Sequence, residues 1–112
     1  MNQALIMNTT QATQTLPALD EILAHLRAGL PDLRVRYHIV SLGVFGSYVR
    51  GEQRKTSDLD ILVEFSVTPT LFQLAGLQRE LTDLAGVQVD LTLRRTLKPD
   101  FGKYILPEVI DL

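Results

Sequence analysis

The sequence contains no cysteine. This absence excludes disulfide frameworks, thiolate zinc sites and cysteine nucleophiles together, and it fits a reducing compartment. No apolar run approaches the roughly 20 residues that a membrane-spanning helix needs. The first residues also lack the basic segment and apolar stretch that direct secretion. We therefore expect a soluble protein with a cytoplasmic location.

An excess of charge of either sign is also missing. Eleven Lys and Arg oppose thirteen Asp and Glu, which gives a formal net charge of −2. This balance argues against a general binder of nucleic acid or of anionic membranes. Hydrophobic residues make up 46% and charged residues 21% of the 112 residues, which is typical of one globular domain. The chain is short for an enzyme.

A flexible N-terminal arm followed by one domain is the expected organisation. Residues 1–15 are polar and rich in Gln, Thr and Asn, as in chain ends that stay frayed or are ordered by a partner. Residues 16–112 show no internal repeat and no low-complexity tract, so we expect them to form a single domain.

The domain begins with a helical pattern after Pro17. One apolar stripe at helical spacing consists of Leu19, Ile22, Leu23, Leu26 and Leu30. We expect Gly29 to end this helix before Pro31. Residues 34–39 alternate between polar and apolar side chains and continue into an apolar run that reaches Phe45. This pattern predicts a strand that enters a covered sheet.

Two further strands and a helix follow. Residues 58–65 and 87–93 have the pattern of strands, and the leucine-rich segment between them has the pattern of a helix. We expect the helix to begin at Thr68 and Pro69 and to stop at Gly86. Its inward leucines would be Leu71, Leu74, Leu77, Leu81 and Leu84. With a last, partly helical segment, the order α-β-α-β-α-β-α predicts an α/β layered domain with a small sheet.

Three aspartates are expected to converge at this sheet. Asp58 and Asp60 are two positions apart, so both side chains leave one face of their strand. Asp90 belongs to the next strand, which the strand–helix–strand unit predicts to run parallel to the first and beside it. Adjacent carboxylates repel one another, and a hard divalent cation such as Mg²⁺ or Mn²⁺ would compensate them. Taken alone, an Asp-x-Asp pair is more often a solvated turn.

A Gly-Ser turn ahead of the aspartates favours the functional interpretation. Gly46 lets the backbone approach a ligand closely, and Ser47 begins a turn with free N–H groups, which together form an anion cradle. Arg50 lies one turn further along and can supply positive charge to a polyphosphate. A Gly-Ser pair alone is more often just a turn. Followed after ten residues by Asp58-x-Asp60, it is far more specific than its parts.

In these motifs the sequence resembles the minimal nucleotidyltransferases of the DNA polymerase β-like superfamily. The matching segments are residues 42–52 (LGVFGSYVRGE), 57–63 (SDLDILV) and 86–92 (GVQVDLT). The resemblance covers nearly the whole chain except the N-terminal arm. It implies an α/β (α+β) fold of order αβαβαβα, with a small mixed sheet flanked by helices.

The resemblance also implies the roles of the site residues. Asp58 and Asp60 would bind metal ions, two Mg²⁺ or in their place Mn²⁺. Asp90 would complete the metal site and help to deprotonate the attacking hydroxyl.

The nucleotide would bind at the turn. By the same resemblance, Gly46 and Ser47 would hold the triphosphate of ATP, with Arg50 as a helper. The implied reaction is nucleotidyl transfer, in which a hydroxyl attacks the α-phosphorus and pyrophosphate leaves while the metals neutralise charge.

Stand-alone chains of this size resemble the antitoxin half of HEPN–MNT toxin–antitoxin pairs. That resemblance implies a protein adenylyltransferase that moves AMP from ATP to a tyrosine of a helical HEPN RNase toxin and neutralises it. The partner, expected in a hetero-oligomer, would supply the acceptor. Direct binding of nucleic acid or of a membrane is not expected. A helical protein with an Arg-x(4–6)-His motif encoded beside this chain would favour this interpretation.

Two alternatives remain open. One is an antitoxin that acts by binding alone, through the N-terminal arm or the apolar residues 104–110. The other is a nucleotidyltransferase for a small molecule or an RNA end. Such an acceptor would contact a basic stretch formed by Arg94, Arg95, Lys98 and Lys103, although a run of this kind is more often a solvated face.

Overall fold

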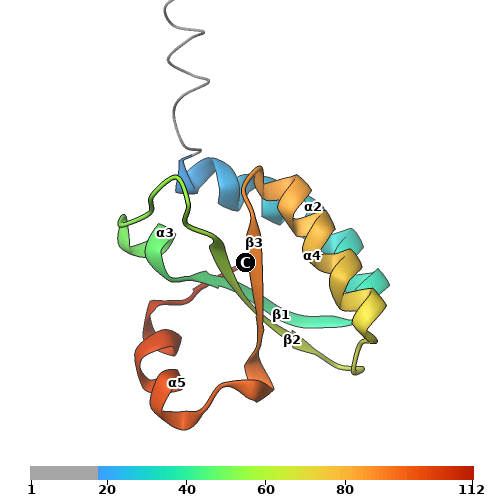
Figure 1. Cartoon of the computed structure of the whole chain (residues 1–112). Coiled ribbons are helices and arrows are strands. Elements are labelled where there is room, and N and C mark those ends of the chain that lie inside the picture. Colours follow the sequence, from blue (N-terminus) through green and yellow to red (C-terminus); the bar gives the residue numbers. More distant parts are fainter. Residues whose placement is uncertain (1–17) are drawn as a thin grey trace, which may run out of the picture.

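The structure of the chain is a computed structural model that describes residues 18–112, and the arm expected over residues 1–15 lies outside this range. The helices and strands are α2 (Leu19–Tyr37), β1 (Ile39–Phe45), α3 (Ser47–Arg50), β2 (Leu59–Phe65), α4 (Leu71–Ala85), β3 (Val89–Leu93), η1 (Arg94–Thr96), α5 (Pro99–Ile105), η2 (Leu106–Glu108) and β4 (Ile110–Asp111). Figure 1 shows α2 and α4 side by side along the sheet. None of the helices described for residues 18–112 has the length and hydrophobicity of a membrane span.

The sheet has four strands in the order β3-β2-β1-β4. β2 and β3 run parallel, as the strand–helix–strand unit predicts, whereas β1 is antiparallel to both β2 and β4. The sheet is therefore mixed. The pattern of the sequence did not predict β4, because a strand of two residues is too short to show an alternation. Figure 1 shows the C-terminal segment, with α5, returning from β3 toward the other edge of the sheet.

The hydrophobic core lies between the sheet and the pair α2 and α4. Leu59, Ile61 and Val63 on one face of β2 are completely buried, together with Leu77 and Leu81 of α4. Burial of each such side chain contributes about 1.5–3 kcal/mol. Because side chains alternate along a strand, the polar residues of β2 leave the opposite face. The core thus fixes which face of the sheet carries the aspartates.

The first helix is longer than the sequence pattern predicted, and residues 34–37 form its last turn rather than the start of a strand. Gly29 does not end the helix. The absence of a side chain at this position instead lets α2 pack closely against Leu84 of α4. Pro31 lies inside the helix, where a proline costs a hydrogen bond. Burial of the next apolar residue, Leu33, favours continuation of the helix.

The start of α4 also differs from the prediction. The cap is Thr70 rather than Thr68, since Thr70 Oγ1 accepts a hydrogen bond from Gln73 N (3.1 Å) and Gln73 Oε1 accepts one from Thr70 N (2.8 Å). This capping box begins the helix at Leu71, which is exposed rather than directed inward. Gly86 ends the helix as predicted, in the left-handed conformation.

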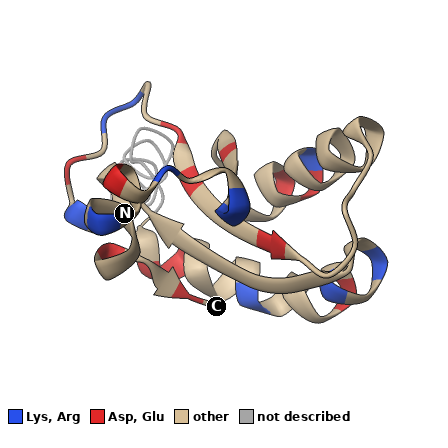
Figure 2. Ribbon diagram, turned by 90° about the horizontal axis from the view of Figure 1, so that it is seen from below, with Lys and Arg blue, Asp and Glu red and all other residues tan. Residues whose placement is uncertain are grey.

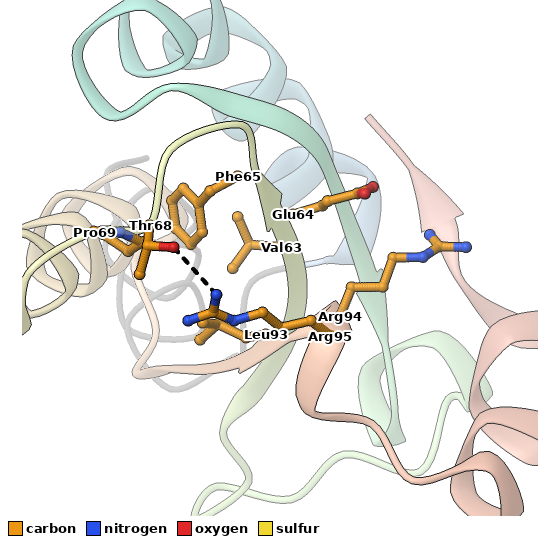
Figure 3. A pocket seen from close by; sticks show the side chains of 8 residues that line it. All are labelled: Val63, Glu64, Phe65, Thr68, Pro69, Leu93, Arg94 and Arg95. Carbon is orange, nitrogen blue, oxygen red and sulfur yellow. Dashed lines mark hydrogen bonds between the residues drawn. The ribbon is translucent and has the colours of Figure 1, made fainter.

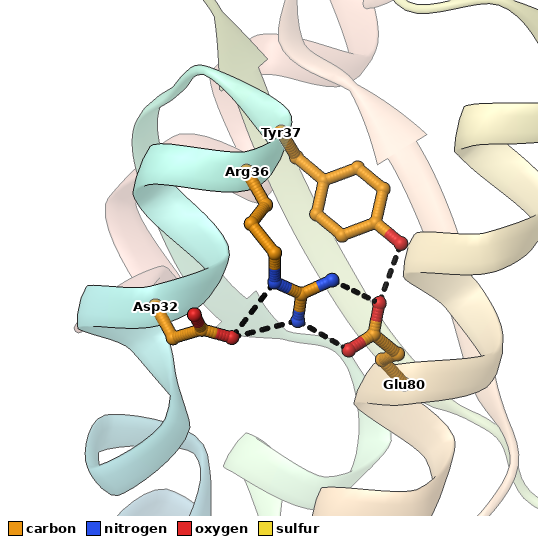
Figure 4. A network of polar contacts seen from close by, with 4 residues as sticks. All are labelled: Asp32, Arg36, Tyr37 and Glu80. Atoms are coloured by element: carbon orange, nitrogen blue, oxygen red, sulfur yellow. Dashed lines mark hydrogen bonds and ion pairs between the residues drawn. The ribbon is translucent and has the colours of Figure 1, made fainter.

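A polar network joins the last turns of α2 to Glu80 within α4 (Figure 4). Arg36 donates hydrogen bonds to Asp32 Oδ2 on its own helix (2.8 Å) and to Glu80 Oε2 on α4 (2.9 Å). The Tyr37 hydroxyl donates to the same Glu80 carboxylate. The hydrogen bond from Arg36, followed by that from Tyr37, lowers the pKa of Glu80 to about 2. The network therefore fixes how the two covering helices lie against each other.

Candidate functional site

Asp60 and Asp90 lie side by side on neighbouring strands. The parallel pairing of β2 with β3 aligns the Cα atom of Asp60 with that of Asp90. Residues in register on adjacent parallel strands project from the same face of a sheet. The convergence expected from the strand–helix–strand unit is therefore present for this pair.

Asp58 lies immediately before β2 and is exposed. Burial raises the pKa of the Asp60 carboxyl, and the negative charges of Asp90 and Asp58 raise it further. The charge of Asp58 also contributes, after burial, to a raised pKa of Tyr48. The three aspartates thus share one electrostatic environment, with the half-buried Asp60 between two exposed carboxylates.

Gly46 brings the end of β1 against the Asp60 carboxylate. The preceding residue, Phe45, is the register partner of Asp60. Gly46 has a φ of 86°, and a Cβ at this position would overlap Asp60 Oδ2. Only glycine combines this backbone conformation with such a close approach. Gly46 is therefore in direct contact with Asp60, which lies fourteen positions later in the sequence.

The turn itself is the short helix α3. The Val49 and Arg50 amides donate to the Gly46 carbonyl (3.0 and 3.1 Å). The N–H groups of Ser47 and Tyr48 come before these two amides in the chain. They are at the start of a helical turn, where N–H groups have no acceptor within the helix. The Tyr48 side chain is buried in the core, so it packs against the fold. Ser47, which begins the turn, is partly exposed.

Arg50 is held by two glutamates. Its Nε donates to Glu52 Oε1 (2.9 Å), and its Nη1 donates to Glu108 Oε1 (3.1 Å). The positive charge of Arg50 lowers the pKa of Asp60 and the charge of Glu108 raises it, so both act on this carboxylate. No sequence signal pointed to Glu108, because it lies 58 positions after Arg50 and arrives by way of the C-terminal segment.

Gln53 is a second residue of this region that the sequence pattern did not single out. It lies in the loop between α3 and β2. Its Oε1 is buried and has no hydrogen-bond partner within the part of the chain that the structure describes. A buried acceptor without a donor is unfavourable.

The carboxylate set fits Mg²⁺ or Mn²⁺ better than zinc, because all its donors are oxygen atoms. Among residues 18–112, no three His, Asp or Glu side chains are gathered into a preformed ligand group. Mg²⁺ usually binds through one or two carboxylates together with substrate phosphates and several waters. The paired Asp60 and Asp90 could supply the one or two carboxylates that such an ion needs.

Comparison with known proteins yields consistent matches. Residues 26–111 match the model of the nucleotidyltransferase domain family. The protein adenylyltransferase MntA of Thermococcus cleftensis is 44% identical over 92 residues, which cover 82% of this chain and 93% of the relative. The solved structure of a minimal nucleotidyltransferase has a TM-score of 0.69 at 41% identity and covers 82% of this chain and 94% of its own.

A more distant structural match is a toxin–antitoxin complex with AMP-PNP. Its TM-score is 0.58 at 24% identity, with 82% of this chain and 69% of the matched chain covered. At that identity the likeness extends to the fold alone. The predicted mixed α/β fold, with its small sheet and covering helices, is confirmed by these structural matches.

Proposed function

The chain belongs to the nucleotidyltransferase domain family, and on that premise we propose that it is the antitoxin of a HEPN–MNT toxin–antitoxin pair. Its reaction is the transfer of AMP from ATP to a tyrosine of the HEPN toxin, which is thereby neutralised. The observation that carries this proposal is the pairing of Asp60 with Asp90 beside the Gly46 turn.

The relatives support a protein as acceptor. The Thermococcus cleftensis relative is named a protein adenylyltransferase, and this chain covers 93% of its length. Structural neighbours include a complex of MntA with its toxin, at 22% identity, and the toxin–antitoxin complex with AMP-PNP. In line with them we take ATP as the nucleotide and, as the family resemblance implies, a HEPN protein as the partner.

The turn would hold the nucleotide. We assign the triphosphate to the amides of Gly46 and Ser47 and to the Ser47 hydroxyl, since backbone N–H groups at a tight turn favour phosphate oxygens. Arg50 supplies a positive charge to the same phosphates once its guanidinium releases Glu52 or Glu108 and contacts them instead. Gly46 lets this backbone reach the aspartates without a side chain in the way.

The aspartates would carry the chemistry. Asp58, Asp60 and Asp90 would hold Mg²⁺, which when bound neutralises charge on the attacking and leaving oxygens. The exposed carboxylate of Asp90 accepts the proton of the acceptor hydroxyl as its oxygen attacks the α-phosphorus. The bond from the α-phosphorus to the bridging oxygen breaks, and pyrophosphate leaves. Positioning and charge compensation suffice for this reaction, so a small scaffold is adequate.

The test is the mass of the acceptor. The purified chain is incubated with Mg-ATP and the HEPN-type protein encoded beside it, and we expect that protein to gain the mass of one or more AMP groups on tyrosine, mapped by fragmentation. The Asp58→Asn/Asp60→Asn variant should add none. Asp83→Asn, which alters an exposed acid on α4, is the matched control and should act like the unaltered chain. Equal addition by the double variant, or none by the unaltered chain, would refute the proposal.

A further inference from the structure

A pocket opens at the opposite end of β2 and β3 from the aspartates (Figure 3). Its volume is about 320 Å³, and its apolar wall includes Phe65 at the end of β2, Leu93 at the end of β3 and Pro69 in the loop before α4. From Asp60 to Phe65 the strand extends roughly 17 Å. The pocket is therefore a separate feature from the candidate active site.

The rim of this pocket is basic. Arg94 and Arg95 line it, against Glu64 as the acidic residue of the lining. Arg95 Nη1 donates to Thr68 Oγ1 (3.1 Å), which holds the guanidinium at the pocket, as Figure 3 shows. The Glu64 carboxylate accepts a hydrogen bond from Ser41 of the neighbouring strand. The pocket thus joins an apolar wall to the guanidinium of Arg95, with Arg94 and Glu64 also in its lining.

The basic rim stands out from the rest of the chain. The formal net charge of the whole sequence is −2, and Figure 2 shows acidic and basic residues interspersed over the ribbon. Of the eight residues that line the pocket, two are arginines and one is an acid. An acidic group is therefore the charge complement of this end of the molecule.

Exposed apolar side chains adjoin the pocket in the sequence. Val67, Leu71 and Phe72 flank the lining residues Thr68 and Pro69 and are 54%, 83% and 91% exposed. Clusters of exposed apolar residues typically mark interaction surfaces. Protein interfaces in particular combine aromatic side chains, arginine and a pocket for an anchor residue.

We propose that the pocket and its apolar border dock an acidic, amphipathic segment of the protein acceptor. One apolar side chain of that segment fills the pocket, and a neighbouring carboxylate contacts the Arg95 guanidinium, which lies at the pocket. The inference rests on the proposed function. A small acceptor bound at the aspartates would not reach the far end of β2, whereas a protein acceptor would. The surface selects the acceptor and takes no part in the chemistry.

The test measures binding and transfer separately. The HEPN-type protein encoded beside the chain is titrated with the unaltered chain, with Arg94→Glu/Arg95→Glu and with Phe72→Ala. We expect the Kd of the complex to rise at least about tenfold for the charge reversal and about threefold or more for Phe72→Ala. The KM for the acceptor should rise in parallel, while kcat at saturating acceptor and the Kd for Mg-AMP-PNP stay within about twofold.

Matched controls come from α5. Lys98→Glu/Lys103→Glu makes the same change of charge away from the rim of this pocket, and Phe101→Ala removes another exposed aromatic ring. Both should bind the acceptor as the unaltered chain does. Equal binding by all variants would overturn the docking surface and leave the proposed function intact.

Two other results would separate the docking surface from the proposed function or would identify a different occupant. If the pocket variants weaken the complex but the unaltered chain transfers no AMP, the docking surface stands and the proposed function fails. If instead the chain alone forms a dimer that Arg94→Glu/Arg95→Glu dissociates, with acceptor binding unchanged, the occupant is a second copy and the proposal is wrong. Thermal unfolding midpoints equal to that of the unaltered chain confirm that each variant is folded.

Discussion

The Cα atoms of Asp60 and Asp90 are aligned across the parallel strands β2 and β3, although thirty positions separate them in the sequence. Gly46 lies against the same Asp60 carboxylate from the end of β1. Three consecutive strands of the chain therefore meet at one point. This convergence allows a domain of this size to bring together a turn suited to phosphate and a set of carboxylates.

Replacing Gly46 by alanine should abolish most of the transfer activity. The new Cβ would overlap the Asp60 carboxylate, and the backbone of an alanine would be strained at the positive φ of this position. Gly51→Ala is a matched control, because Gly51 also has a positive φ (71°) but no atom within 4 Å of the added Cβ. We expect Gly51→Ala to lose about 1 kcal/mol of stability in chemical denaturation, and Gly46→Ala to lose more, because the overlap with Asp60 adds to the backbone strain. AMP transfer should fall more than about tenfold only for Gly46→Ala, and equal activities would contradict the role of this contact.

The pair of Arg50 and Glu108 should control nucleotide affinity. If Arg50 serves the triphosphate, Arg50→Gln should weaken the binding of Mg-ATP by about tenfold. Glu108→Gln removes a competing negative charge from Arg50 and should leave that affinity unchanged or raise it a few fold. Calorimetric titration with Mg-AMP-PNP measures both. A normal affinity in Arg50→Gln would remove Arg50 from the nucleotide site.

Glu80 should make the folded domain sensitive to acid. Its pKa in the folded chain is about 2, against 4.5 for an unperturbed glutamate, because Arg36 and Tyr37 donate hydrogen bonds to the carboxylate. A carboxyl whose pKa is lowered by folding stabilises the protein above its unperturbed pKa, and this contribution is lost as the pH falls from about 4.5 to about 2.

The size of this effect is modest. Both side chains of the Arg36–Glu80 pair are substantially exposed, so we expect a loss of about 1 kcal/mol of unfolding free energy in that range. Glu80→Gln should be less stable at neutral pH and should show a flatter decline in acid. Urea denaturation at a series of pH values measures this, with Asp83→Asn as the control on the same helix. Parallel curves for Glu80→Gln and the unaltered chain would show that the network contributes no linkage.

Neutralisation of the toxin should require the aspartates. In cells that express the HEPN-type protein encoded beside the chain, the unaltered chain should restore growth and Asp58→Asn/Asp60→Asn should not. Binding of the double variant to the toxin, measured by co-purification, should persist, because neither aspartate lies at the proposed docking pocket. Rescue by the double variant would favour the alternative in which the chain acts by binding alone.

Much of the site could be predicted from the sequence because its parts follow local rules. The strand–helix–strand unit places Asp90 on the strand beside that of Asp60, although Asp58, which the sequence pattern put on the same strand as Asp60, lies just before β2. A glycine at the end of β1, before a short helical turn, gives a similarly local signal. These rules depend on neighbours in the chain, and they correctly predicted the order of the elements through α5.

Contacts between distant segments could not be predicted in this way. Gly29 has the appearance of a helix end, yet it serves close packing against Leu84, which is 55 positions away. Glu108 reaches Arg50 only because β4 returns the C-terminal segment to the edge of the sheet beside β1. The short β4 carries no pattern of its own. Each of these features depends on packing between elements, which composition and periodicity do not encode.

The central claim is that the aspartates transfer AMP, rather than phosphate, from ATP to a protein. The most direct test incubates the chain and the HEPN-type protein encoded beside it with Mg-ATP that is labelled either at the α- or at the γ-phosphate. We predict that only the α-label becomes attached to the HEPN-type protein, and that chelation of Mg²⁺ or the Asp60→Asn/Asp90→Asn substitution abolishes it. Attachment of the γ-label, or equal labelling by the substituted chain, would contradict the account.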